Sequence, residues 1–177
     1  MGWIIKNKII TILMFLLLSV TPVYAYSLSS VRIANKSANI YYVVGSYTYV
    51  KTAWQNAISD WHSAVSSSFT EVSMDEGCSL GIMNESSSSL YGRVNYTTSG
   101  STITGFAAYV NIGNTVLSSA SSANKAKIAR SVACHELGHL LGLNDLTSGT
   151  AIMNTNRNRL TLYTPQTDDI NGVSAGY

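Results

Sequence analysis

The chain has 177 residues, of which 11% are charged, and its formal net charge is +2. It contains no basic run or patterned basic patch, so the sequence gives no reason to expect a nucleic-acid partner. Sparse charge together with plentiful Ser, Thr, Asn, Gly and Tyr fits a secreted protein with a β-rich surface.

The first 25 residues are typical of a signal peptide. Lys6 and Lys8 give a positively charged start, residues 9–20 form an apolar run, and Ala25 ends a small-residue cleavage site. An uncleaved N-terminal anchor is the alternative, but the apolar run is short for a membrane span and no later segment is long enough. We therefore expect a secreted, extracellular protein with no membrane partner after signal cleavage.

Cleavage would leave residues 26–177 as one domain. Removing Lys6 and Lys8 from the 11 basic residues leaves nine, which balance the nine acidic residues, so the mature chain is formally neutral. A length of 152 residues, 177 less 25, is sufficient for one domain with its own core. We expect this domain to be a monomer.

The first half of the domain is predicted to be mainly strands. Residues 39–44 are rich in Ile, Tyr and Val and predict a strand, and an apolar stripe over residues 49–65 predicts a helix capped by Thr48. Short strands broken by turns are expected at residues 69–74, 80–83, 91–97 and 102–111.

The second half is predicted to be mainly helical. An apolar stripe over residues 122–141 predicts a second long helix. A short C-terminal helix is expected after a cap at Thr164 or Thr167, with Asp168 and Asp169 favourable near its positive end. Strands followed by helices that cross one side of them indicate an α+β fold.

The chain has two cysteines, Cys78 and Cys134. In an exported protein they could pair as a disulfide. The sequence does not show whether they lie close enough, so two free thiols are an equal alternative.

Residues 135–145 carry the most specific pattern in the chain, H-E-x-x-H-x-x-G-x-x-D. His135 and His139 lie four positions apart on the predicted helix, so both imidazoles can reach one metal ion. Glu136 is close enough to both to act as a base on a metal-bound water. The only other histidine, His62, is expected to be a surface or packing residue.

The third ligand is expected to be Asp145. Gly142 can end the helix in a left-handed conformation, after which the chain can return and present Asp145 to the metal. Asp168 and Asp169 are the alternatives, because zinc accepts a carboxylate oxygen and no glutamate follows Glu136. Three protein ligands and one open position describe a catalytic zinc site, so we expect one catalytic Zn²⁺ ion.

Residues 135–145 resemble the long zinc motif of the metzincin clan of zinc endopeptidases, H-E-x-x-H-x-x-G-x-x-H/D. The aspartate version is similar to that of the snapalysin-type secreted bacterial proteases, whereas other parts of the chain resemble the matrixin branch. Residues 149–154 are similar to the clan's Met-turn, which implies that Met153 lies beneath the zinc as a hydrophobic floor. The implied fold is α+β, a zincin-like single domain whose twisted mixed β-sheet accompanies an active-site helix and a C-terminal helix.

The resemblance also implies a place for the substrate. Residues 103–111 resemble the clan's edge strand, which runs above the active-site helix and pairs with an extended substrate. The residues expected to face the substrate are Gly105, Phe106, Ala107, Ala108 and Tyr109. Residues 155–163 are expected to wall a specificity pocket beside the zinc, and residues 167–177 resemble the last helix of matrixins.

The sequence therefore predicts a secreted zinc endopeptidase whose partner is a peptide or protein substrate. Zinc would polarise the peptide carbonyl while Glu136 acts as the base. Two alternatives remain: a zincin-like binding module that cuts nothing, and a zinc hydrolase that acts on a non-protein amide. The presence of Glu136 argues against the binding module, because loss of the base is the simplest route to a silent domain.

Overall fold

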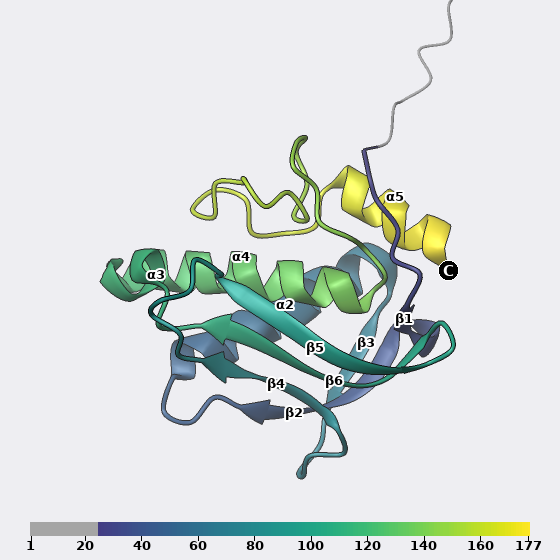
Figure 1. The fold of residues 1–177 in the computed structure, drawn as a ribbon, viewed down its shortest axis with the longest axis horizontal. Helices are drawn as coiled ribbons and strands as arrows, with labels where there is room; N and C mark the ends of the chain where they lie inside the picture. Colours follow the sequence, from purple (N-terminus) through teal and green to yellow (C-terminus); the bar gives the residue numbers. More distant parts are fainter. Residues whose placement is uncertain (1–24) are drawn as a thin grey trace, which may run out of the picture.

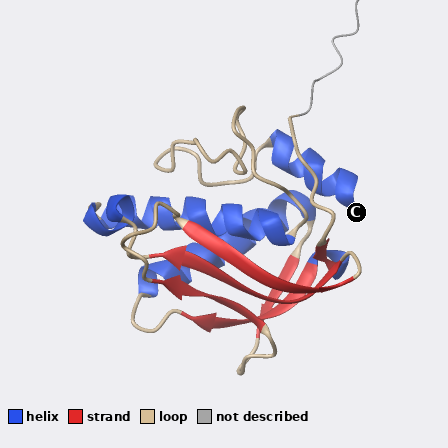
Figure 2. Cartoon of the chain, viewed as in Figure 1, coloured by secondary structure: helices blue, strands red, loops and turns tan. Residues whose placement is uncertain are grey.

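Two long helices lie on the same face of a twisted sheet (Figure 1 and Figure 2). This computed structural model describes residues 25–177, so the predicted signal peptide, apart from Ala25, lies outside the described residues. The elements in chain order are β1 (Arg32–Ile33), the 3-10 helix η1 (Ala34–Lys36), β2 (Ser37–Val43), α2 (Thr48–Val65), β3 (Ser68–Glu71), β4 (Cys78–Met83), β5 (Gly92–Ser99), β6 (Thr102–Asn111), α3 (Thr115–Ser119), α4 (Ser122–Leu140) and α5 (Thr167–Gly176).

The sheet has six strands and is mixed, as predicted. Five strands are parallel and follow the order β1-β6-β4-β2-β3, and β5 pairs antiparallel with β6. Helices α2 and α4 pack against each other and against this sheet, while α5 lies beyond α4 near the chain end (Figure 1). The expected α+β domain is therefore confirmed.

The prediction that residues 103–111 form an edge strand is wrong. The residues that were expected to pair with a substrate are Gly105, Phe106, Ala107, Ala108 and Tyr109. The last four each have partners in both β4 and β5, and Gly105 pairs with Thr97 of β5. The chain turns at Gly100 between β5 and β6, and β5 covers the side of β6 opposite β4, so β5 is an edge strand of the sheet.

Buried tryptophans join α2 both to the sheet and to α4. Trp54 and Trp61 are both fully buried. The indole N–H of Trp54 donates to the Gly81 carbonyl at 3.2 Å, and that of Trp61 donates to the Cys134 carbonyl at 2.8 Å. Truncating a buried Trp to Ala typically costs about 3–5 kcal/mol. These two contacts therefore hold α4 at a defined position relative to the sheet.

The predicted helices are confirmed to within one or two residues, but their caps differ. Thr48 is the first residue of α2 rather than its cap, and Tyr47 caps without a side-chain hydrogen bond. Gln166 caps α5, in place of Thr164 or Thr167, through a reciprocal pair of bonds with Asp169. Within residues 25–177, no helix is long and apolar enough to cross a membrane.

The disulfide alternative is not realised, because Cys78 and Cys134 are both free thiols. Cys78 is the first residue of β4 and pairs with Phe106 in the sheet. Cys134 is fully buried in the helix layer, where its carbonyl accepts the Trp61 bond. The two cysteines thus belong to different layers of the domain.

Candidate metal centre and active-site cleft

Helix α4 carries both histidines of the motif on one side. Their rings meet edge to face with centroids 4.8 Å apart, as expected for residues about one turn apart. His135 is 8% exposed and His139 is partly buried, so both rings lie at the boundary between the core and the surface.

The chain reverses direction after α4 at Gly142, as the sequence predicts. Gly142 has a φ of 90°, in the region that favours glycine. Its N–H donates to the His139 carbonyl at 3.1 Å, and the N–H of Leu143 donates to the Gly138 carbonyl at 3.0 Å. These bonds satisfy the last carbonyls of the helix and send the following residues back along it.

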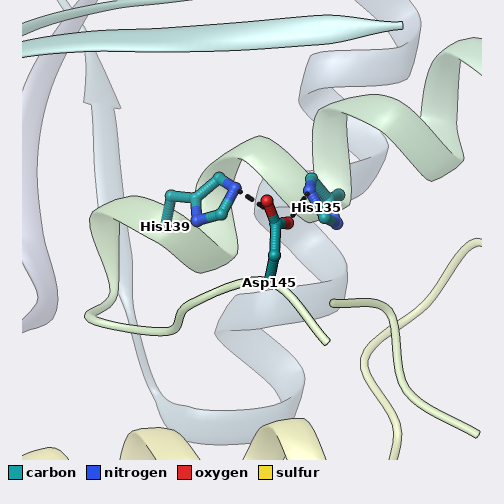
Figure 3. A group of neighbouring side chains, drawn as sticks. All are labelled: His135, His139 and Asp145. Atoms are coloured by element: carbon teal, nitrogen blue, oxygen red, sulfur yellow. Dashed lines mark ion pairs between the residues drawn. The ribbon is translucent and has the colours of Figure 1, made fainter. Parts of the chain in front are cut away.

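This reversal brings Asp145 to the two histidines (Figure 3). One Asp145 oxygen, Oδ1, lies 3.0 Å from Nε2 of His135 and 3.5 Å from Nε2 of His139. One ligand atom from each residue lies within 4.8 Å of the others, so the group could hold a metal ion. Two imidazole nitrogens and a carboxylate oxygen are a donor set that suits zinc.

The backbone fixes which nitrogen of each ring faces Asp145. Nδ1 of His135 lies 2.9 Å from the Ile152 carbonyl, and Nδ1 of His139 lies 2.9 Å from the Leu143 carbonyl. A carbonyl only accepts, so each Nδ1 carries the proton and each Nε2 presents its lone pair.

In this arrangement the Nε2 lone pairs of both histidines face an oxygen of Asp145, which is also a hydrogen-bond acceptor. Burial lowers the pKa of His135 to about 4, so its ring is neutral near pH 7. A neutral Nε2 lone pair then faces the carboxylate oxygen of Asp145 at 3.0 Å. A bound cation would satisfy all three atoms at once, which is the relationship expected of metal ligands supported by the backbone.

Asp169, one of the two alternative third ligands, has another use in the structure. Its two carboxylate oxygens accept hydrogen bonds from three backbone N–H groups, those of Ile152 at 2.7 Å, Met153 at 3.2 Å and Gln166 at 2.8 Å. It is 1% exposed and ties the start of α5 to the segment around Met153. The metal-binding group contains Asp145 and neither Asp168 nor Asp169.

Met153 lies under the turn of α4 that separates the two histidines. Its side chain is 1% exposed. A Cβ placed on Gly138 would collide with Met153 Sδ, so the thioether is in direct contact with the helix backbone. The residue at position 138 must therefore be very small for Met153 to pack against the helix in this way.

Arg157 joins α4 to the segment that follows Met153. It is 7% exposed, and its guanidinium donates to the side chain and carbonyl of Ser131 at 2.9 Å each and to the Asn154 carbonyl at 3.1 Å. The same Nη1 lies 3.1 Å from Nδ1 of His135. Because Nδ1 carries the proton that it donates to Ile152, it cannot accept from Arg157, and Nη1 donates to the Asn154 carbonyl instead.

Glu136 is the buried carboxyl group of the site. It is 5% exposed, and burial raises its pKa to about 8, an effect that nearby Arg157 opposes. A Cβ on Gly92 of β5 would collide with Oε1 of Glu136 and with Val132. The Glu136 carboxyl group therefore packs against the backbone of the edge strand.

The candidate metal centre opens into a cleft of about 500 Å³. One wall is the start of β5 and the residues before it, among them Tyr91 and Arg93. The other wall includes Thr155, Arg157 and Arg159, which lie in the segment predicted to form a specificity pocket. None of the residues 105–109 lines this cleft.

Arg157 and Arg159 lie within the predicted pocket segment, residues 155–163, but the sequence assigned no individual role to them or to Gly92. Nothing in their local sequence distinguishes them, because each acts through residues far along the chain. Residues 95–99 are mostly polar (N-Y-T-T-S) and all exposed in the structure, whereas β6 is apolar on one face. That contrast is typical of an edge strand beside an interior one.

The fold and the donor set define an α+β domain with a candidate metal centre of the metalloprotease type. The profile of the matrixin family, a peptidase family, matches residues 33–177. The chain therefore belongs to the matrixin family, a family of zinc-dependent metalloproteases. No curated protein matches the chain.

Proposed function

We propose that this protein is a secreted zinc endopeptidase with one catalytic ion. The observation that carries the proposal is the convergence of His135, His139 and Asp145 beside the buried carboxyl group of Glu136. The three residues leave one side of the site open to the cleft, as a catalytic centre requires. Family membership supports a metalloprotease in general.

A zinc ion held by the two histidines and Asp145 would supply Lewis-acid chemistry to a peptide carbonyl. Glu136 is the base: a cation beside it would favour its charged form against the effect of burial, and its carboxylate would then accept a proton from the attacking water. It then delivers that proton to the amine of the departing peptide. The carbonyls of Ile152 and Leu143 keep the imidazole lone pairs directed at the site throughout.

An extended peptide would pair with the free edge of β5. This strand borders the cleft and, among residues 25–177, has a partner on one side only, so its outer N–H and C=O groups can bond to a substrate. Backbone pairing gives affinity with little choice of sequence. Specificity would therefore depend on side chains around the cleft.

Secretion is proposed from residues 1–25 alone. Sequencing the N-terminus of protein exported by an expressing cell tests this proposal, with Tyr26 as the expected first residue. Retention of Lys6 in a membrane-bound product would contradict it.

Digestion of a peptide library with the zinc-loaded protein, residues 26–177, tests the peptidase activity. Cleavage should disappear on chelation of the metal and fall by roughly 10²–10⁴-fold in Glu136→Ala, the typical contribution of a general base. A wild-type protein that retains zinc but cuts no peptide would favour the silent binding module. Release of product from a non-protein amide, with all peptides intact, would favour the other hydrolase.

A further inference from the structure

The cleft wall carries a cation without a carboxylate partner. Arg93, Arg157 and Arg159 all line the cleft. Arg93 is neutralised by two hydrogen bonds to Glu85, at 3.0 and 2.9 Å. Within the described part of the chain, Arg157 and Arg159 form no salt bridge.

The two unpaired arginines are held in different ways. Arg157 is 7% exposed and directs its N–H groups to Ser131 and to backbone carbonyls, so it serves the fold. Arg159 is only half-buried and its nearest acceptors are two backbone carbonyls, Thr155 at 3.0 Å and Arg157 at 3.5 Å. Its Nε–H is buried without any hydrogen-bond partner, so the protein's own acceptors do not satisfy this guanidinium.

Tyr91 holds the guanidinium of Arg159 in place. The Cζ atom of Arg159 lies 3.8 Å from the centre of the Tyr91 ring, which is a close stacked contact. Tyr91 lies just before β5, so this pair bridges the two walls of the cleft. A guanidinium held in this way has already lost much of the freedom that ligand binding would otherwise remove.

The balance of charge in the cleft favours an anionic ligand. The carboxylates of Glu136 and Asp145 face the candidate metal centre, where a divalent cation would neutralise them. With Arg93 paired to Glu85, Arg157 and Arg159 are the cleft arginines that form no salt bridge within residues 25–177, although both feel the charge of Glu136. With a divalent cation bound, the charge left at the cleft wall would be positive, and such a wall attracts ligands of the opposite sign.

We propose that Arg159, stacked on Tyr91, binds the carboxylate of an acidic residue next to the scissile bond. Arg159 is then a specificity-determining residue, and the substrates are peptides with Asp or Glu beside the cleavage point. A guanidinium matches a carboxylate with two parallel hydrogen bonds, which a neutral amide cannot reproduce. This inference rests on the proposed peptidase function.

Cleavage of matched peptides that carry Glu or Gln on either side of the scissile bond tests the proposal. The wild type should prefer Glu on one of the two sides by about 10-fold or more in kcat/KM, the scale of a hydrogen bond to a charged group. Arg159→Gln should bring the ratio to within about twofold, and Arg159→Glu should favour Lys at the same position. Lys127→Gln removes one charge from an exposed position of α4 and should leave the ratio unchanged.

Binding of the same peptides to Glu136→Ala separates failure of this inference from failure of the peptidase function. A Glu peptide that binds about 10-fold tighter than its Gln partner, with the difference lost in Arg159→Gln, supports the role of Arg159 even if the wild type cuts nothing. Equal affinity for the two peptides, no binding of either, or a preference that survives in Arg159→Gln would each overturn it. Thermal unfolding of each variant confirms that the comparison is between folded proteins.

Discussion

The sulfur of Met153 lies directly against the backbone of Gly138, the residue that immediately precedes His139. Gly138→Ala should therefore destabilise the domain by about 1–3 kcal/mol, because the added methyl overpacks a buried contact. The sign of this change in the free energy of unfolding is informative, because replacing Gly by Ala within a helix otherwise stabilises by roughly 0.5–1 kcal/mol. Chemical denaturation measures the change.

Gly176→Ala in α5 is the matched control for this substitution. A Cβ at Gly176 would meet only Leu28, at an ordinary 3.8 Å. The control should be neutral or slightly stabilising. An equal effect of the two substitutions would mean that Met153 moves aside without cost.

A second close approach, between Gly92 and Glu136, links the edge strand to the proposed base. Gly92→Ala should displace the Glu136 carboxyl group, since the new methyl would collide with Oε1. We expect peptide cleavage to fall by about 10-fold or more, because a base must lie within hydrogen-bonding reach of the proton it abstracts. Zinc content should not change, since the atoms nearest to a Cβ at Gly92 belong to Glu136, Val132 and Tyr109 rather than to a proposed ligand.

Asn95→Ala is the control for Gly92→Ala, because Asn95 is an exposed residue of the same strand. It should leave both cleavage and zinc content close to wild type. Loss of zinc in Gly92→Ala, measured by elemental analysis, would show that the strand supports the metal centre rather than the base.

Asp145 and Asp168 provide a direct comparison for the third ligand. Asp145→Ala should weaken zinc affinity by more than about 10–100-fold, the loss typical of residues that merely support a ligand. Asp168→Ala should retain zinc, because Asp168 lies in the first turn of α5 outside the metal-binding group. Competition with a chromogenic chelator measures both, and the reverse ranking would move the ligand to α5.

Asp169 is predicted to act on the segment around Met153 rather than on zinc directly. Asp169→Asn leaves one acceptor oxygen for the N–H groups of Ile152, Met153 and Gln166 and places an amide N–H₂ against at least one of them. An unsatisfied buried group of this kind costs about 1–3 kcal/mol. Denaturation of Asp169→Asn beside Asp168→Asn should show the loss in the first variant only.

The metal-binding group was predictable because its spacing is local. The four-position step from His135 to His139 places both on one helix face, and Gly142 adopts the left-handed conformation that its position suggests. The long helices were predictable for the same reason, since an apolar stripe records the face that each helix buries.

The order of the strands was not predictable from such patterns. Residues 92–99 and 102–111 both alternate enough to predict strands, but which of them is the edge depends on pairing with β4. That pairing joins residues 28 positions apart, such as Leu80 and Ala108. Arg159 and Tyr91 likewise meet only in the folded chain, so no local signal indicates the cation at the cleft wall.

The two cysteines should react very differently with iodoacetamide. Cys134 is fully buried and burial raises its pKa well above the ordinary value, so it should remain unlabelled until the protein unfolds. Cys78 is partly exposed and should react in the folded protein. Partial burial raises the pKa of Cys78 above its ordinary value of 9.0, so less thiolate exists at any given pH and the rate should still be rising beyond pH 9.

Mass spectrometry before and after unfolding counts the labels, with Cys78→Ser as the control. One label per folded chain and two per unfolded chain are expected, and no label after unfolding without reductant would indicate that the thiols had paired.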